Sequence, residues 1–222
     1  MNYATVDLER KARCGFPEVI FAPGKTCEWL IGIVQKLVDS GQDAMVTRLD
    51  DEQSRYLAEH FPKAQVDRLA RTFWLKQSPV VPLCGRVAII TAGTSDLPVA
   101  QEAAVTARAI GATADVIVDV GVAGLHRLLN RLPEFASADA IVVVAGMDGA
   151  LPSVVGGLVT CPVIAVPTSV GYGTSFDGVA ALLTMLNACS ANVVTVNIDA
   201  GFKAGYVAAI IAKQKTGGAS PR

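Results

Sequence analysis

The residues best suited to chemistry lie between Asn187 and Gly205. Cys189 supplies a thiol, and after a short run of β-branched residues the chain continues with Asn197, Asp199 and Lys203. A thiol can act as a nucleophile, and polar groups that follow a strand are typical of binding loops in α/β proteins. Cysteine is also among the most buried residue types, so simple packing at a helix end explains the thiol as well. The local pattern leaves both interpretations open.

Glycine-rich loops follow four other strand-like runs in the second half of the chain. The loops are 92–98, 121–124, 145–152 and 167–178, and all except 121–124 combine glycines with small polar or acidic residues. Glycine lets backbone N–H groups approach a ligand, and the start of the following helix favours an anion. The sequence has neither a GxxxxGK[ST] P-loop nor a GxGxxG fingerprint. We therefore expect a nucleotide or another phosphorylated small molecule, held by loops of a different kind.

The elements that position these loops follow a regular β-α pattern. Strand-like runs lie at 87–91, 116–120, 141–144, 163–166 and 193–198, and helix-like runs at 99–110, 125–132, 151–159, 179–186 and 206–213. Strands that are apolar throughout are typical of a parallel sheet covered on both faces, with ligands bound outside the carboxyl ends of the strands. We therefore predict a three-layer α/β core.

The first part of the chain has a different composition. Residues 1–85 hold 22 of the 39 charged side chains, and a proline- and glycine-containing stretch at 77–85 marks the change. We predict a small N-terminal α/β domain at 1–83 and a larger domain at 84–222. In the first domain we expect helices at 4–14, 26–40 and 50–60, and strands at 18–22, 44–49 and 71–75.

Composition argues against several classes of protein. A net charge of −1 does not fit a nucleic-acid binder or a membrane-surface protein. No apolar run reaches transmembrane length, and the N-terminus lacks the apolar core of a secretory signal. The five cysteines are widely spaced without a CxxC pair, and two histidines are too few for a histidine-rich metal site. We therefore expect reduced thiols and a cytoplasmic protein.

Several long motifs, spread over nearly the whole chain, resemble those of one enzyme family. They are Gly93-Thr-Ser-Asp-Leu-Pro-Val-Ala, Asp119-Val-Gly-Val-Ala-Gly-Leu-His-Arg, Val144-Ala-Gly-Met-Asp-Gly-Ala-Leu-Pro-Ser-Val-Val, Val166-Pro-Thr-Ser-Val-Gly-Tyr-Gly and Leu186-Asn-Ala-Cys, with Arg13-Cys-Gly-Phe-Pro-Glu and Gly24-Lys-Thr near the start. These motifs resemble the LarB family, the carboxylases of nickel-pincer nucleotide cofactor biosynthesis. The resemblance implies a flavodoxin-like, PurE-like core and a homo-octamer. The apolar segment Ala180–Leu186 fits burial between subunits.

The resemblance also implies a reaction. Such enzymes take nicotinic acid adenine dinucleotide, add a carboxylate to its pyridinium ring from carbon dioxide or bicarbonate, and release AMP by cleaving the phosphoanhydride. Cys189, in the Asn-x-Cys motif, is then the covalent nucleophile, because thiolate addition turns the electron-poor ring into a nucleophilic enamine. Asp148 or Asp96 is then the base that removes the ring proton. Asp96 alternatively binds ribose or a metal.

We expect the dinucleotide to lie over the loops at the strand ends. The predicted binding residues are Gly93, Thr94, Ser95, Gly146, Met147, Gly149, Pro167, Thr168, Ser169, Tyr172, Asn197, Asp199 and Lys203, together with Arg13 and Lys25. Arg13 and Lys25 lie near turns where they can hold a phosphate or carboxylate, although a solvated basic surface explains them equally well. No metal ligand and no firm cofactor are expected; magnesium assistance in phosphoanhydride cleavage stays open.

The sequence departs from the family pattern at three positions. Asp148, Ala200 and Lys203 stand where the family usually has Glu, Asn and Gly. Aspartate is shorter than glutamate by one carbon–carbon bond, about 1.5 Å. These differences bear on the substrate or product more than on the class of reaction.

Two other functions remain open. A purine-pathway mutase or carboxylase shares the fold, but the histidine that shuttles its proton is replaced here by Ala150. A non-catalytic nucleotide-sensing module would keep the glycine loops and would need no thiol. Substitution of Cys189 separates this module from the carboxylase.

Overall fold

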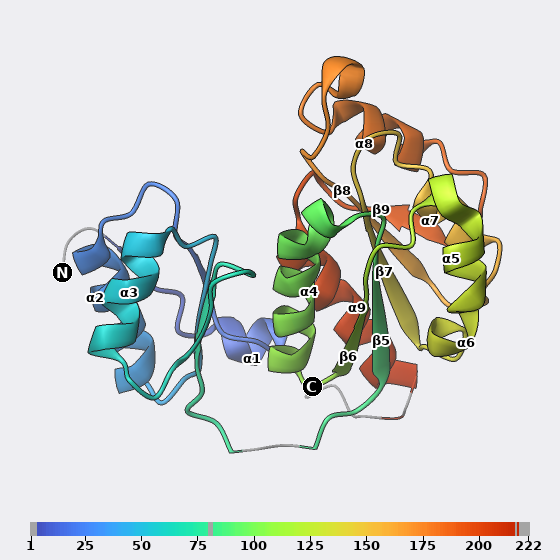
Figure 1. The fold of residues 1–222 in the computed structure, drawn as a ribbon. Coiled ribbons are helices and arrows are strands. Elements are labelled where there is room, and N and C mark those ends of the chain that lie inside the picture. Colours follow the sequence, from blue (N-terminus) through green and yellow to red (C-terminus); the bar gives the residue numbers. More distant parts are fainter. Residues whose placement is uncertain (1–3, 80–81, 216, 218–222) are drawn as a thin grey trace. The chain divides into compact units, whose positions relative to one another are not determined.

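The computed structural model describes residues 4–79, 82–215 and 217. The chain divides into two compact units, which fall within residues 1–81 and 82–219. Each unit has its own sheet (Figure 1). The two units are described separately.

The larger unit is built on five parallel strands in the order β6-β5-β7-β8-β9. β5 is the first strand of this unit; β6 pairs with it on one side, and β7 pairs with it on the other. The topological switch point therefore lies between β5 and β7, as in flavodoxin-like sheets. The strands are β5 (Arg86–Thr91), β6 (Thr113–Ile117), β7 (Ala140–Ala145), β8 (Val163–Pro167) and β9 (Val193–Thr195).

Helices cover both faces of this sheet (Figure 1). Alternate residues of one strand serve the two faces: Val87 and Ile89 pack against α4 and α9, whereas Ala88 and Ile90 belong to the core beneath α5, α6, α7 and α8. A strand buried on both faces is apolar throughout, and this is why the apolar runs of the sequence predicted the strands. The predicted three-layer α/β core is confirmed. Its helices are η1 (Thr94–Asp96), α4 (Leu97–Ile110), η2 (Val122–Gly124), α5 (Leu125–Asn130), α6 (Leu132–Phe135), α7 (Leu151–Gly156), η3 (Gly173–Ser175), α8 (Val179–Leu186) and α9 (Gly201–Lys215).

Several element boundaries differ from those predicted. The strand expected at 116–120 is β6 at 113–117, because the backbone turns away at Asp119, whose φ is +62°. The helix expected at 125–132 is divided into α5 and α6 just before Pro133, which cannot continue a helix interior. The last helix begins at Gly201 instead of 206, so the predicted loop from Asn197 to Gly205 ends at Ala200.

The close packing of α9 on α4 explains two glycines that the sequence pattern placed in that loop. A Cβ at Gly205 would lie 2.2 Å from the carbonyl oxygen of Ala103, and one at Gly201 would lie 2.3 Å from that of Val99. Only glycine permits this approach of the two backbones. These glycines therefore serve helix packing.

The smaller unit has a mixed sheet in the order β1-β2-β4-β3, in which only β1 and β2 are parallel. Thr26 caps α2, and Asp50 with Gln53 forms a capping box for α3, so the helix starts follow from the sequence. The predicted small α/β domain is confirmed, although the helix expected at 4–14 is shorter and β3 was not predicted. The elements are α1 (Arg10–Cys14), β1 (Val19–Phe21), α2 (Cys27–Asp39), β2 (Ala44–Thr47), α3 (Asp51–His60), β3 (Gln65–Asp67) and β4 (Thr72–Leu75).

None of the helices in the described part of the chain combines the length and apolar character that a transmembrane span requires.

Candidate active site

A cavity of about 450 Å³ opens at the carboxyl edge of the parallel sheet, at the switch point between β5 and β7. Open α/β sheets bind their ligands at this place, and the volume lies in the range of small-molecule sites. Six of the residues predicted from the sequence line it: Gly93, Ser95, Asp96, Gly146, Met147 and Asp148. The loops after β5 and β7 therefore meet as expected.

Asp96 is almost completely buried, with 4% of its surface exposed. Its Oδ1 accepts a 2.7 Å hydrogen bond from the hydroxyl of Thr168, and its Oδ2 accepts a 2.9 Å bond from the N–H of Gly93. Burial raises the pKa of Asp96, whereas the hydrogen bonds from Thr168 and Gly93 and the nearby backbone of Gly146 oppose that rise.

Asp148 has a different environment, because it is exposed at the cavity. Its Oδ1 accepts a 3.3 Å bond from the N–H of Ala150 within the same loop. Two contacts fix the position of this loop. The N–H of Met147 donates to the carbonyl oxygen of Val170, and Gly149 packs so closely that a Cβ there would lie 2.7 Å from the carbonyl oxygen of Ala181. This carboxylate can therefore contact a bound molecule directly.

Arg127 supplies a cation to the cavity wall, and we had assigned it no role from the sequence. Its Nη1 donates a 2.8 Å bond to Asp119, which follows β6. A Cβ at Gly124 would lie 2.8 Å from the Nε of Arg127, so this glycine makes room for the guanidinium. The sequence did indicate these residues, because Asp119, Gly124 and Arg127 belong to one of the motifs that resemble the LarB family. A guanidinium in such a position suits a phosphate or a carboxylate.

Comparison with known proteins covers both units. Residues 1–77 match the family model of the LarB/PurE-like N-terminal domain, and residues 86–219 match that of AIR carboxylase. The chain belongs to the LarB family. Its larger unit is the PurE-like core of that family, as the motifs predicted.

The chain is also similar to individual proteins. An uncharacterized protein of Methanocaldococcus jannaschii is 41% identical over 218 residues, covering 94% of this chain and 83% of that protein. The N5-carboxyaminoimidazole ribonucleotide mutase of the same organism is 35% identical over 126 residues, or 55% of this chain and 75% of the mutase. A solved PurE2 variant from Treponema denticola has 24% identity and a TM-score of 0.44, covering 54% of this chain and 74% of its own.

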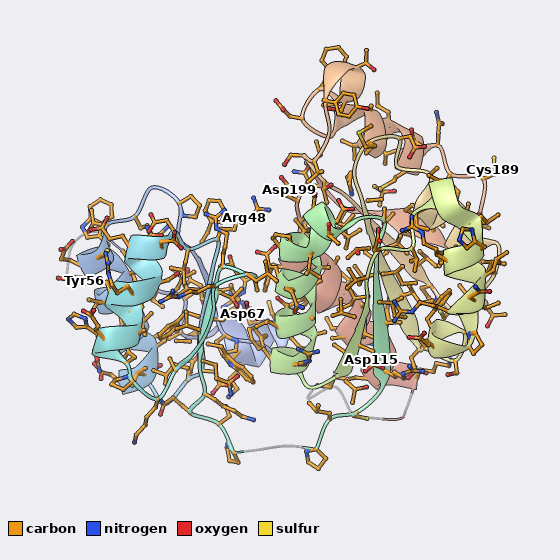
Figure 2. All side chains as sticks on the ribbon, viewed as in Figure 1. Arg48, Tyr56, Asp67, Asp115, Cys189 and Asp199 are labelled. Atoms are coloured by element: carbon orange, nitrogen blue, oxygen red, sulfur yellow. The ribbon has the colours of Figure 1, made fainter. Side chains whose placement is uncertain are left out.

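Cys189, the nucleophile that the LarB resemblance implies, does not line the cavity. It is exposed and lies between α8 and β9, so it precedes its strand, whereas the cavity lies where the strands end. Figure 2 shows Cys189 well apart from Asp199, which follows β9. We expected the strand at 193–198 to be covered on both faces, and this expectation was wrong. β9 is an edge strand, and Val194 in it is 53% exposed.

The remaining residues predicted for LarB substrate binding lie outside the cavity lining. Thr168 is fully buried against Asp96, and the N–H of Ser169 donates a 2.9 Å bond to Asp199. Lys203 belongs to the first turn of α9, and Tyr172 is exposed on the loop after β8. Thr94, Gly149, Pro167 and Asn197 are likewise absent from the cavity wall.

Arg13 and Lys25, which were predicted to bind substrate from the N-terminal LarB domain, form contacts within the smaller unit. Arg13 forms a two-bond pair with Asp7, whose pKa is lowered by this contact. The Nζ of Lys25 donates a 2.7 Å bond to the carbonyl oxygen of Phe21. Their part in substrate binding stays a prediction.

Among the described residues, no group of three or more His, Cys, Asp or Glu side chains is placed to hold a metal ion.

Proposed function

We propose that this LarB family member is a carboxylase and hydrolase that acts on nicotinic acid adenine dinucleotide. It adds a second carboxylate to the pyridinium ring from carbon dioxide or bicarbonate, and it cleaves the phosphoanhydride to release AMP. One observation carries the proposal: three family motifs, which begin at Gly93, Asp119 and Val144, converge on a single cavity at the switch point of the sheet. The cavity contains a guanidinium, which suits an anionic substrate, and an exposed carboxylate, which suits a substrate that must lose a proton.

The cavity residues divide the work of binding and proton transfer. The guanidinium of Arg127 holds a phosphate or the ring carboxylate. The backbone at Ser95, in the turn η1 that leads into α4, favours a second anionic group. Asp148 accepts the ring proton, because it is the exposed carboxylate of the cavity wall.

The thiol of Cys189 makes the ring reactive. Its thiolate adds to the ring carbon para to the nitrogen, and the ring becomes a neutral dihydropyridine. The enamine carbon then attacks carbon dioxide and forms the new carbon–carbon bond. Asp148 removes the proton from that carbon, and the electron pair expels the thiolate and restores aromaticity. Cys161 does not suit this role, because burial raises the pKa of its thiol.

Because Cys189 lies outside the cavity, the proposal requires a second copy of the chain. Exposed apolar side chains lie on α8, next to this thiol: Leu183 is 58% exposed and Leu186 is 63% exposed. A surface of this kind is typical of a protein–protein interface. We therefore propose a homo-octamer in which Cys189 of one copy serves the cavity of a neighbour.

Mass spectrometry of wild type and Cys189→Ser, each incubated with the dinucleotide and bicarbonate, tests the proposal. We expect the wild type to form biscarboxylated mononucleotide and AMP through a thioether adduct on Cys189. The serine variant should bind the dinucleotide but form no adduct, because an alcohol has a far higher pKa than a thiol. Product formation by the serine variant at the wild-type rate would exclude covalent catalysis.

The similarity to the mutase of Methanocaldococcus jannaschii favours a second candidate, a carboxylase or mutase of aminoimidazole ribonucleotide. Against it stands Ala150, which occupies the position of the proton-shuttling histidine. Turnover of N5-carboxyaminoimidazole ribonucleotide, without turnover of the dinucleotide, would favour this candidate.

A further inference from the structure

The carboxylate of Asp96 lies where three loops that are distant in sequence meet. Gly93 after β5 and Thr168 after β8 donate hydrogen bonds to it, and the backbone of Gly146 after β7 lies close enough to lower its pKa. Thr168 is fully buried and Asp96 nearly so, so water cannot replace these bonds easily. A buried carboxylate remains charged only where such donors surround it.

Gly146 belongs to the loop that carries Asp148, and it packs directly against Thr168. A Cβ at Gly146 would lie 2.2 Å from the carbonyl oxygen of Val170 and 2.7 Å from the hydroxyl of Thr168, so the loop lies tightly against the β8 loop. The next residue, Met147, has a φ of +49°, a left-handed conformation that side chains disfavour. Asp148 follows directly. An unfavourable conformation of this kind persists only where the surrounding contacts impose it.

We infer that Asp96 is a positioning residue: it fastens the loops after β5, β7 and β8 to one another and so orients Asp148 in the cavity. The fastening follows from the contacts of Asp96, whereas its effect on turnover rests on the proposed function. Each oxygen of the Asp96 carboxylate already accepts a hydrogen bond, Oδ1 from Thr168 and Oδ2 from Gly93. A base or a ribose ligand needs at least one oxygen directed at the substrate.

The helix that follows Asp96 offers a matched control. Glu102 is a buried carboxylate of α4, with 5% of its surface exposed. It lies against Gly201 at the start of α9, and it does not line the cavity. Glu102→Gln therefore changes a buried carboxylate on α4 without touching the three loops.

Hydrogen–deuterium exchange on the full chain tests the fastening without reference to activity. Asp96→Asn removes the charge and replaces one acceptor oxygen with an N–H donor, so the hydrogen bonds that hold the loops weaken and exchange should rise in the peptides that contain Gly93 and Gly146. Thr168→Val, which removes only the hydroxyl donor, should give a smaller rise in the same peptides. Glu102→Gln should leave them unchanged. Unchanged exchange in both Asp96→Asn and Thr168→Val would overturn the inference, whatever the substrate proves to be.

Kinetics then separate positioning from direct chemistry. A positioning role predicts that kcat falls about 100-fold in Asp96→Asn, since a misplacement near 1 Å can cost that much. KM should change far less, and the acid limb of the pH–rate profile should remain, because the base is still present. Loss of that limb in Asp96→Asn would identify Asp96 as the base, and a raised KM with unchanged kcat would identify it as a binding residue; either result overturns the inference. If the wild type carboxylates nothing, the proposed function fails, and the exchange experiment still decides the fastening.

Discussion

The hydroxyl of Thr168 donates a 2.7 Å hydrogen bond to Oδ1 of Asp96, across 72 residues of sequence and between two strand-end loops. Burial raises the pKa of Asp96 above its ordinary value of 3.8. A carboxyl whose pKa is raised in the folded state stabilises that state at low pH, and this contribution is lost as the pH rises through the raised value. The melting temperature of the wild type, relative to Asp96→Asn, should therefore fall as the pH increases from about 3.8 upward. Thermal unfolding over a pH series measures this, and a difference that is flat or grows with pH would contradict it.

Arg127 should govern the affinity for the anionic group of the substrate. Hydrogen bonds to charged groups typically contribute about 1.5–3 kcal/mol, so Arg127→Ala should weaken AMP binding roughly 10- to 150-fold. Arg131→Ala is the control, because Arg131 pairs with Glu134 and does not line the cavity. Titration calorimetry with AMP measures both. Equal affinities for the wild type and Arg127→Ala would remove this residue from the site.

The fold was predictable because the strands are buried on both faces. Every residue of a run such as Ile141–Val144 is apolar, which is typical of a central strand in a sheet covered on both faces. The same rule explains the error at β9: an edge strand packs against one neighbour, so Val194 is apolar and yet exposed. Its β-branched residues indicated a strand correctly but did not indicate its burial.

The candidate site was predictable where a single loop carries the residues, as in Gly93–Asp96 and Gly146–Asp148. Arg127 was missed because its place in the cavity wall depends on contact between the loops after β6 and β5, where the N–H of Gly121 donates to the carbonyl oxygen of Ala92. The position of Cys189 could not be judged from its neighbours in sequence. A residue before a strand lies at the edge opposite the strand-end loops.

Asp148 should affect turnover more than binding. General bases typically contribute about 10²–10⁴-fold, so Asp148→Ala should lower kcat by an amount in that range. AMP affinity should change little, because Asp148 carries no positive charge for the phosphate. Asp148→Glu restores the residue that the family usually has, and it should keep measurable activity. Single-turnover carboxylation with labelled bicarbonate measures these rates, and an unchanged rate in Asp148→Ala would assign the proton transfer elsewhere.

Mixed assemblies should show whether Cys189 acts on a neighbouring cavity. Cys189→Ser lacks the thiol and Arg127→Ala lacks the cavity cation, so each alone should be inactive or nearly so. If one copy supplies the thiol and another the cavity, an equal mixture should restore about a quarter of the sites, because each site draws its two parts from two copies at random. The variants are produced together with different tags, purified through both tags and assayed for biscarboxylated product. A mixture of Arg127→Ala with Asp148→Ala is the matched control: every cavity then carries one defect, and no site should be restored. Equal activity in the two mixtures, in assemblies shown by light scattering to contain several copies, would rule out catalysis between copies.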